Sequence, residues 1–129
     1  MNFEKYTLKA QESIQKAAEI ASSAEQQAIE PAHILKGLIQ GDENILSFIF
    51  KKLNINRNSV ETELDEILTS FPKVSDQQTY LSQDSSAALQ RAEKFCKEIY
   101  NDISRDYMGV HRLGMIFYKL NEYDEAAFY

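Results

Sequence analysis

The chain of 129 residues, 43% of them hydrophobic and 26% charged, has the composition of a globular protein and can bury one core of ordinary size. This composition excludes an intrinsically disordered chain, and no stretch approaches the ~20 apolar residues that a membrane-spanning helix requires. The net charge of −6 argues against nucleic acid as a partner, because the molecule as a whole repels phosphate backbones and no run of lysine and arginine forms a compensating stripe.

The N-terminus and the single cysteine bear on the compartment and on cross-links. Residues 1–5 lack the basic start and the apolar run of a signal peptide, so we expect a cytoplasmic protein. Cys96 cannot form an intramolecular disulfide. It lies on an apolar helical face with Leu89, Ala92 and Ile99, which predicts that Cys96 packs in the core as a small hydrophobic side chain.

The first predicted helix begins after Thr7 and extends to residue 22 or 23. The Thr7 hydroxyl can accept a hydrogen bond from a backbone N–H of the first turn, which is the role of an N-cap residue. Apolar residues then recur at the spacing of a 3.6-residue helix, and charged residues occupy the other side. The apolar face consists of Ala10, Ile14, Ala17, Ala18 and Ala21. This pattern predicts an amphipathic helix with one buried face.

Two shorter helices are predicted next. Pro31 suits the first turn of a helix, because its missing N–H would have no intrahelical partner there. We therefore place a helix at residues 31–39, with Glu30 as its cap and Gly41 as its stop. A third helix is predicted at residues 43–53. Its inward residues are expected to be Ile45, Phe48, Ile49 and Leu53.

The fourth predicted helix has signals at both ends. Asn56, in a turn at residues 54–58, can cap its start, and Pro72 disfavours helical geometry in Phe71, which places the end of the helix there. Its apolar positions are Val60, Leu64, Ile67, Leu68 and Phe71. Residues 72–78 are polar and aperiodic, as is typical of a connector.

The second half of the chain repeats the helical pattern less regularly. A fifth helix is predicted from near Ser82, followed by a polar turn at residues 100–106, a helix at residues 110–119 and a short end at residues 121–129. The apolar positions of the fifth helix are Ala88, Ala92, Phe95, Cys96 and Ile99, and those of the next are Leu113, Ile116 and Phe117. No stretch alternates as a strand would, so the predicted fold class is all-α.

The two halves of the chain form a diverged internal repeat. Thr7 begins a helix that leads to residues 28–35, and Ser82 begins a similar helix that leads to residues 107–113. We therefore divide a single domain, residues 1–129, into repeat one at about 1–71, a connector at about 72–80 and a shortened repeat two at about 81–129. Repeats of this kind pack on each other and usually build a binding surface, which favours binding over catalysis.

The glycines do not form a nucleotide-binding loop. Gly109 and Gly114 have the separation found in a phosphate-binding loop, but Met115 and Ile116 occupy the places of its lysine and its hydroxyl residue. Phosphate binding by this segment is therefore not predicted.

The two histidines, His33 and His111, do not form a metal site. Neither has a second metal ligand one helical turn away, so each is expected to make a local hydrogen bond or to pack between helices. We predict no catalytic residue, metal or cofactor. A small hydrolase whose residues meet only in space is left as a remote third hypothesis.

Three segments of the chain together carry a family resemblance. They are Met1-Asn2-Phe3-Glu4-Lys5-Tyr6-Thr7, Ala28-Ile29-Glu30-Pro31-Ala32-His33-Ile34-Leu35, and Phe71-Pro72-Lys73-Val74 followed by Tyr80-Leu81-Ser82. In this order and spacing they resemble the N-terminal domain of ClpB-type AAA+ disaggregase chaperones, the double Clp repeat. The resemblance covers residues 1 to about 100 and weakens from about Ser104 onward.

The resemblance implies an all-α fold of about seven to eight helices in two pseudo-twofold halves. It implies a non-catalytic module that captures exposed apolar segments of unfolded or aggregated client proteins in a shallow hydrophobic groove, for an ATP-driven chaperone ring. The AAA+ ATPase modules of that ring belong either to the same chain or to a separate one. We expect the isolated domain to be a monomer, with neither nucleic acid nor a membrane as a partner.

The resemblance also implies site residues. The groove positions carried over to this chain are Thr7, Phe95, Ile99 and Ile116, and each has a core or cap role as its alternative. His111 stands where the second repeat usually has an acid near the groove, and Asp106 is a candidate to supply a carboxylate at the rim instead. Ala32 stands where relatives that recognise phosphorylated arginine carry glutamate, which disfavours that activity here.

Two functions remain open on these grounds. The first is client capture in the groove. The alternative is a stand-alone adaptor-docking or regulatory protein of a Clp chaperone or protease, in which charged faces bind another folded protein and the groove is idle. The two hypotheses differ in which substitutions abolish binding: apolar ones in the groove, or charge reversals on the surface.

Overall fold

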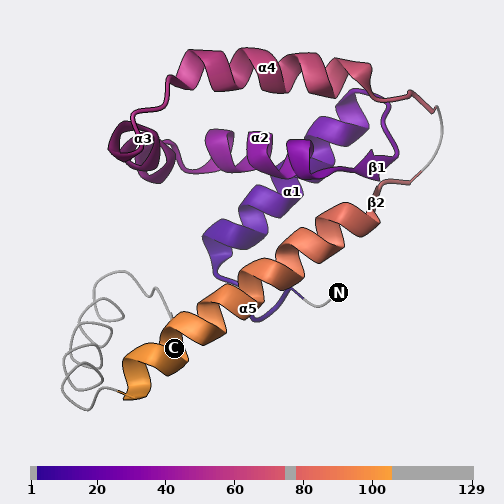
Figure 1. Ribbon diagram of the computed structural model, residues 1–129. Helices are drawn as coiled ribbons and strands as arrows, with labels where there is room; N and C mark the ends of the chain where they lie inside the picture. Colours follow the sequence, from indigo (N-terminus) through magenta and orange to yellow (C-terminus); the bar gives the residue numbers. More distant parts are fainter. Residues whose placement is uncertain (1–2, 75–77, 106–129) are drawn as a thin grey trace. The chain divides into compact units, whose positions relative to one another are not determined.

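The computed structural model of the protein describes residues 3–74 and 78–105 (Figure 1). These residues form five α-helices and two short strands. The helices are α1 (Leu8–Ser23), α2 (Pro31–Gly41), α3 (Glu43–Lys52), α4 (Arg57–Ser70) and α5 (Gln83–Arg105), and the strands are β1 (Ala28–Ile29) and β2 (Tyr80–Leu81). The chain divides into two compact units, Met1–Ser86 and Ala87–Tyr129, so α5 begins in the first unit and continues in the second.

The first unit is organised around α1 and α2, which pack against each other. α1 begins where the sequence predicts, and Thr7 Oγ1 accepts a hydrogen bond from the Ala10 N–H at 3.2 Å. Its buried residues are Ser13, Ile14, Ala17 and Ala21. Gly37 of α2 permits the close approach of the two helices, because a Cβ at this position would overlap the carbonyl oxygen of Ser13.

The ends of α2 and α4 lie close to their predicted positions. α2 starts at Pro31 and includes Gly41 as its last residue. α4 follows Asn56, whose side chain accepts a hydrogen bond from the Ser59 N–H at 3.2 Å. It ends at Ser70, and the next residue, Phe71, has extended geometry, as expected for a residue that precedes proline.

The two strands correct the prediction that strands are absent. β1 and β2 pair in parallel, with Ala28 opposite Tyr80 and Ile29 opposite Leu81. Ser85 at the start of α5 reinforces the pair, because its Oγ donates a hydrogen bond to the Ile29 carbonyl at 2.6 Å. Strands of two residues are too short to produce an alternating pattern, so the sequence contains no periodic signal for them.

The core of the first unit consists of two clusters of buried side chains. One cluster comprises Ile39, Phe50, Leu64 and Leu68, from α2, α3 and α4. The other comprises Ala17, Ala21 and Ile29, from α1 and β1. α2 contributes partly buried side chains to both clusters, so it holds the unit together.

The orientation predicted for α3 is wrong. The residues expected to face inward, Ile45, Phe48, Ile49 and Leu53, are all exposed. Phe50 is the buried residue of this helix, and Leu46 packs partly buried against the core. Apolar side chains occupy almost every position from 45 to 50, so they surround the helix, and periodicity alone does not select the inward face.

α5 corrects a second prediction. The sequence analysis placed a polar turn at residues 100–106, but the helix continues to Arg105. Residues 100–105 contain neither glycine nor proline, so nothing in them forces the helix to end. The predicted second repeat extends beyond the described residues, as do the helix at 110–119 and the apolar residues Leu113 and Phe117. The double repeat, the pseudo-twofold relation and the count of seven to eight helices therefore stay predictions.

Candidate functional site

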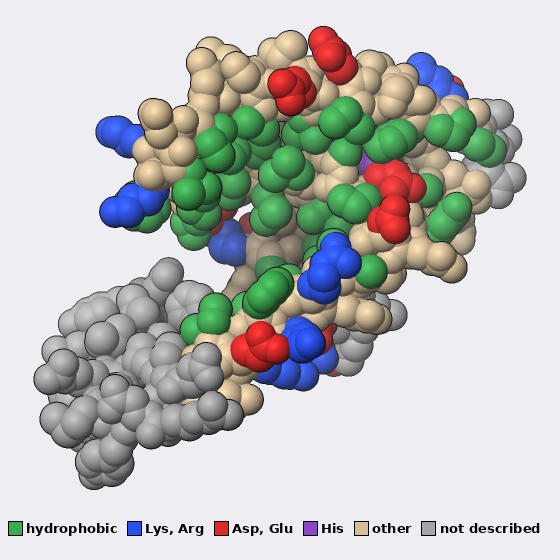
Figure 2. Space-filling view, in the orientation of Figure 1, with side chains coloured by type: hydrophobic (Ala, Val, Ile, Leu, Met, Phe, Trp, Pro, Cys, Tyr) green, Lys and Arg blue, Asp and Glu red, His purple; other side chains and the backbone are tan. Residues whose placement is uncertain are grey.

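The candidate site in the second unit is an apolar stripe along α5. Phe95 and Ile99 lie one helical turn apart, with 62% and 58% of their surface exposed. Cys96 lies beside them and is also exposed, so the prediction that it packs in the core is wrong for the described part of the chain. We call Phe95, Cys96 and Ile99 the α5 stripe. Figure 2 shows hydrophobic side chains on α5 next to charged ones.

Charged residues flank the α5 stripe along the helix. Lys94 Nζ lies 3.9 Å from Glu98 Oε1, at a spacing of one turn, and both side chains are exposed. Such a surface pair adds little to stability, because water screens both charges. The helix is therefore amphipathic, with a polar side that keeps it hydrated and an apolar side that can be buried only by contact with something else.

Thr7 lies in the first unit, directly before α1. Its side chain is exposed, and its hydroxyl caps α1 as given above. The cap role that stood as the alternative for this residue is thus observed. Only the hydroxyl of Thr7 takes part in the cap, so its methyl group is free to contact a client. The cap role and the groove role are therefore compatible.

The remaining site residues lie outside the described part of the chain. They are Ile116 of the groove positions, and Asp106 and His111 of the rim. Their roles stay predictions.

The polar cluster around His33 is structural. His33 is fully buried, and its Nδ1 accepts a hydrogen bond from the Glu30 N–H at 2.9 Å. Its Nε2 lies 2.6 Å from Gln26 Oε1, and Gln26 Nε2 donates in turn to the Leu68 carbonyl at 2.6 Å. Because Nδ1 accepts, the proton of the neutral ring is on Nε2, which donates to Gln26.

The environment of His33 also sets its charge. Burial lowers the pKa of His33 from its ordinary value of 6.5, and the nearby Glu30 carboxylate offsets part of this effect. The imidazole is therefore neutral at pH 7, with both nitrogens occupied. This confirms the prediction that His33 makes local hydrogen bonds, and it removes His33 from the candidates for ligand contact.

The match to known protein families covers nearly all of the described residues. Residues 5–105 match the family model of the Clp repeat (R) N-terminal domain. The chain belongs to the family of Clp repeat N-terminal domains. The match extends from before α1 to the last residue of α5, so it includes Thr7 and the α5 stripe.

Two similar proteins are named chaperone protein ClpB. The chain is 46% identical over 99 residues to a chaperone protein ClpB from Bacteroides thetaiotaomicron, which is 77% of this chain and 12% of the relative. It is 40% identical over 93 residues to a chaperone protein ClpB from Porphyromonas gingivalis, which is 72% of this chain and 11% of the relative. The chain therefore spans about an eighth of the length of these chaperones.

The described residues of this Clp repeat domain contain no candidate metal site. No three side chains of histidine, cysteine, aspartate or glutamate converge on a position where they could share a metal ion, as far as the described residues go. None of the helices in the described ranges combines the length and the apolar character needed to cross a bilayer.

Sequence reasoning missed a second apolar surface, on α3. Its signal was present, because Ile45, Ile49 and Leu53 recur at the spacing of one helical turn, but they were assigned to the core. An apolar stripe looks the same in sequence whether a helix turns it inward or outward. Only the packing of α3 through Leu46 and Phe50 decides between the two.

Proposed function

We propose that this chain is a non-catalytic protein-binding module that captures exposed apolar segments of unfolded or aggregated client proteins. The observation that carries the proposal is the α5 stripe, where large apolar side chains are exposed in a chain that belongs to the Clp repeat N-terminal domain family. A soluble protein gains nothing by exposing such side chains together unless another molecule covers them.

The proposed mechanism is the burial of apolar surface between α5 and a client segment. Phe95 and Ile99 provide the contact from α5. The family resemblance adds Thr7 and Ile116 as groove positions and Asp106 and His111 as rim positions. The stripe is short, and an unfolded client loses conformational freedom when it binds. We therefore expect weak, rapidly exchanging complexes, with dissociation constants on the order of 10 μM or higher.

The proposed place of the module is at the entrance of an ATP-driven chaperone. The relatives named chaperone protein ClpB are much longer than this chain, which spans only 12% of the first of them. In the proposal the chain contributes capture alone, and ATPase modules in the same polypeptide or in a separate one contribute the mechanical work.

The proposal is tested by titrating the full chain into a fluorescently labelled, permanently unfolded model protein and following anisotropy. The double substitution Phe95→Ser and Ile99→Ser is expected to weaken binding by about tenfold or more, because it removes both large anchors. Gln90→Ser is the matched control, since residue 90 is exposed on the opposite side of α5 and should leave affinity unchanged.

The same titration separates client capture from the alternative of adaptor docking through charged faces. Charge reversals at Glu63 and Glu66 on the exposed side of α4 should leave client affinity unchanged if the stripe is the binding surface. If these reversals abolish binding while the double substitution in α5 does not, the proposal is wrong and docking of a folded partner takes its place.

A further inference from the structure

α3 exposes a continuous apolar face in the first unit. Phe48 and Leu53 have 67% and 63% of their surface exposed, and Ile45 and Ile49 are also exposed. Phe48 and Ile49 follow Ile45 by three and four residues, and Leu53 follows Ile49 by four, so the four residues form a single stripe along the helix and its C-cap. We call them the α3 face. The adjacent side of the helix is held to the core by Phe50 and Leu46.

The shape of the α3 face fits another helix. Side chains at positions i, i+3 and i+4 form ridges that pack into the grooves of a second helix. All four residues of the face belong to one helix and its C-cap, so a partner helix can run along them. A helix laid along the face would cover all four side chains at once.

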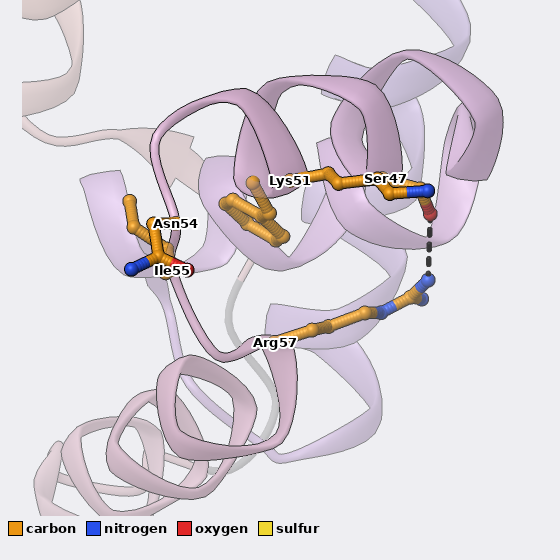
Figure 3. Close-up of a pocket in the computed structure, with 6 residues that line it drawn as sticks. Ser47, Lys51, Asn54, Ile55 and Arg57 are labelled. Atoms are coloured by element: carbon orange, nitrogen blue, oxygen red, sulfur yellow. Dashed lines mark hydrogen bonds between the residues drawn. The ribbon is translucent and has the colours of Figure 1, made fainter.

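A shallow pocket of about 300 Å³ lies on the other side of α3 from this face, beside the turn that leads to α4. Its lining residues are Ser47, Phe50, Lys51, Asn54, Ile55 and Arg57. In Figure 3 the side chains of Lys51 and Arg57 extend toward Ser47, and Ser47 Oγ accepts a hydrogen bond from Arg57 Nη1 at 3.4 Å. The cations Lys51 and Arg57 and the Ser47 hydroxyl thus lie near the apolar side chains of Phe50 and Ile55. Cations and hydroxyl groups of this kind can bind a carboxylate.

The local charges leave a positive excess at this end of α3. Arg57 is already paired with two acids, since its Nη2 lies 3.3 Å from Glu43 Oε1 and its Nε lies 3.5 Å from Glu61 Oε1. Lys51 and Lys52 are exposed and form no ion pair with any residue in the described ranges. The C-terminal end of α3 is therefore locally positive, although the chain as a whole has a net charge of −6.

We propose that the α3 face and the lysines at its C-terminal end form a second docking surface, which binds an acidic amphipathic helix of a partner protein. The apolar side of that helix covers Phe48 and its neighbours, and its carboxylates lie against Lys51 and Lys52. This surface is separate from the α5 stripe and does not depend on client capture.

The probe is a fluorescein-labelled amphipathic peptide of about twelve residues, long enough for three helical turns, with leucines on one side and glutamates beside them. A second peptide has glutamine in place of every glutamate. Both are titrated with the full chain. We expect the glutamate peptide to bind about tenfold more tightly than the glutamine peptide at low salt, and the difference to shrink as salt screens the charges.

Variants assign the binding to α3. Phe48→Ser is expected to weaken binding of the glutamate peptide by about tenfold or more, since it removes the most exposed anchor. Lys51→Glu combined with Lys52→Glu should abolish the preference for glutamate while leaving the glutamine peptide unaffected. All three residues are exposed, so the variants should fold, and a thermal melt followed by circular dichroism verifies this.

The control separates this inference from the proposed function. Phe95→Ser should leave peptide binding unchanged, and Phe48→Ser should leave capture of the unfolded client unchanged. Equal affinity for the two peptides, or binding that Phe48→Ser does not alter, would overturn the inference. Sedimentation showing a dimer that Phe48→Ser dissolves, without binding of the peptide, would assign the face to self-association and would overturn it as well.

Discussion

His33 connects two helices that are distant in the sequence. Its Nε2 donates to Gln26, and Gln26 donates to the Leu68 carbonyl, so the first turn of α2 is linked to the end of α4. We call these hydrogen bonds, together with the one from the Glu30 N–H to His33, the His33 relay. Every polar atom of the relay has a partner, so the cost of burying it is offset. A protonated ring would carry a hydrogen on Nδ1, opposite the Glu30 N–H, and that hydrogen bond would be lost.

The relay predicts that acid destabilises the fold. Because burial lowers the pKa of His33 below 6.5, the unfolded chain takes up the proton more readily than the folded one. The neutral His33 ring therefore makes its full contribution to the free energy of unfolding above pH 6.5, and this contribution is lost as the pH falls below that value. Urea unfolding at a series of pH values between about 7 and 5 measures it.

A histidine substitution isolates this effect. His33→Gln should flatten the loss of stability over the same pH range, although it lowers stability at neutral pH. A slope that survives unchanged in His33→Gln would refute the assignment.

Gly37 is the residue at which α1 and α2 come closest. We predict that Gly37→Ala destabilises the fold by about 1–3 kcal/mol, because the new methyl group must displace the backbone of Ser13, despite the better helix propensity of alanine. Gly41→Ala is a graded control, since its Cβ meets the Ser13 hydroxyl at 3.0 Å, and a side chain can yield where backbone cannot. Equal stabilities of the two variants in urea unfolding would contradict the proposed contact.

Among the elements, α1 allows a direct test of its cap. Thr7→Ala should lower the free energy of unfolding by about 1 kcal/mol, because the Ala10 N–H loses its acceptor, and Thr7→Ser should restore most of it. The measurement is urea unfolding of the three chains at neutral pH. If Thr7→Ala leaves stability unchanged but impairs client binding, Thr7 acts in the groove and the cap is of no energetic consequence.

The elements also show which sequence signals were sufficient. α1 and α4 could be located because each combines a capping side chain with a clear apolar stripe, and α4 also has Pro72 beyond its end. α5 was predicted too short, because polar residues after position 100 were interpreted as a turn although none of them breaks a helix. The β1–β2 pair joins segments about fifty residues apart through only two residues each, which no local pattern encodes.

The candidate site was only partly accessible from sequence. The family resemblance placed Phe95 and Ile99, but helical periodicity assigns the same positions to a core. Their exposure became visible only in the structure. The α3 face shows the converse case, since its residues were predicted to be buried and the packing of Phe50 turned them outward.

At the scale of the whole molecule, the described residues present two apolar surfaces of different character. The α5 stripe is flanked by charges of both signs, whereas the α3 face ends in lysines. In the two proposals, the α5 stripe holds an unfolded client and the α3 face binds a helix of a partner protein. The substitutions that test them lie on different helices, so either proposal can fail while the other stands.

The most direct test of client capture is a site-resolved one. The isotopically labelled full chain is mixed with a permanently unfolded protein, and chemical shifts are followed by nuclear magnetic resonance. We predict that the signals of Phe95 and Ile99 shift progressively with client concentration, while that of Ile39, buried in the core of the first unit, stays in place. Unchanged signals of Phe95 and Ile99 at a client excess that fully shifts other surface residues would contradict the account.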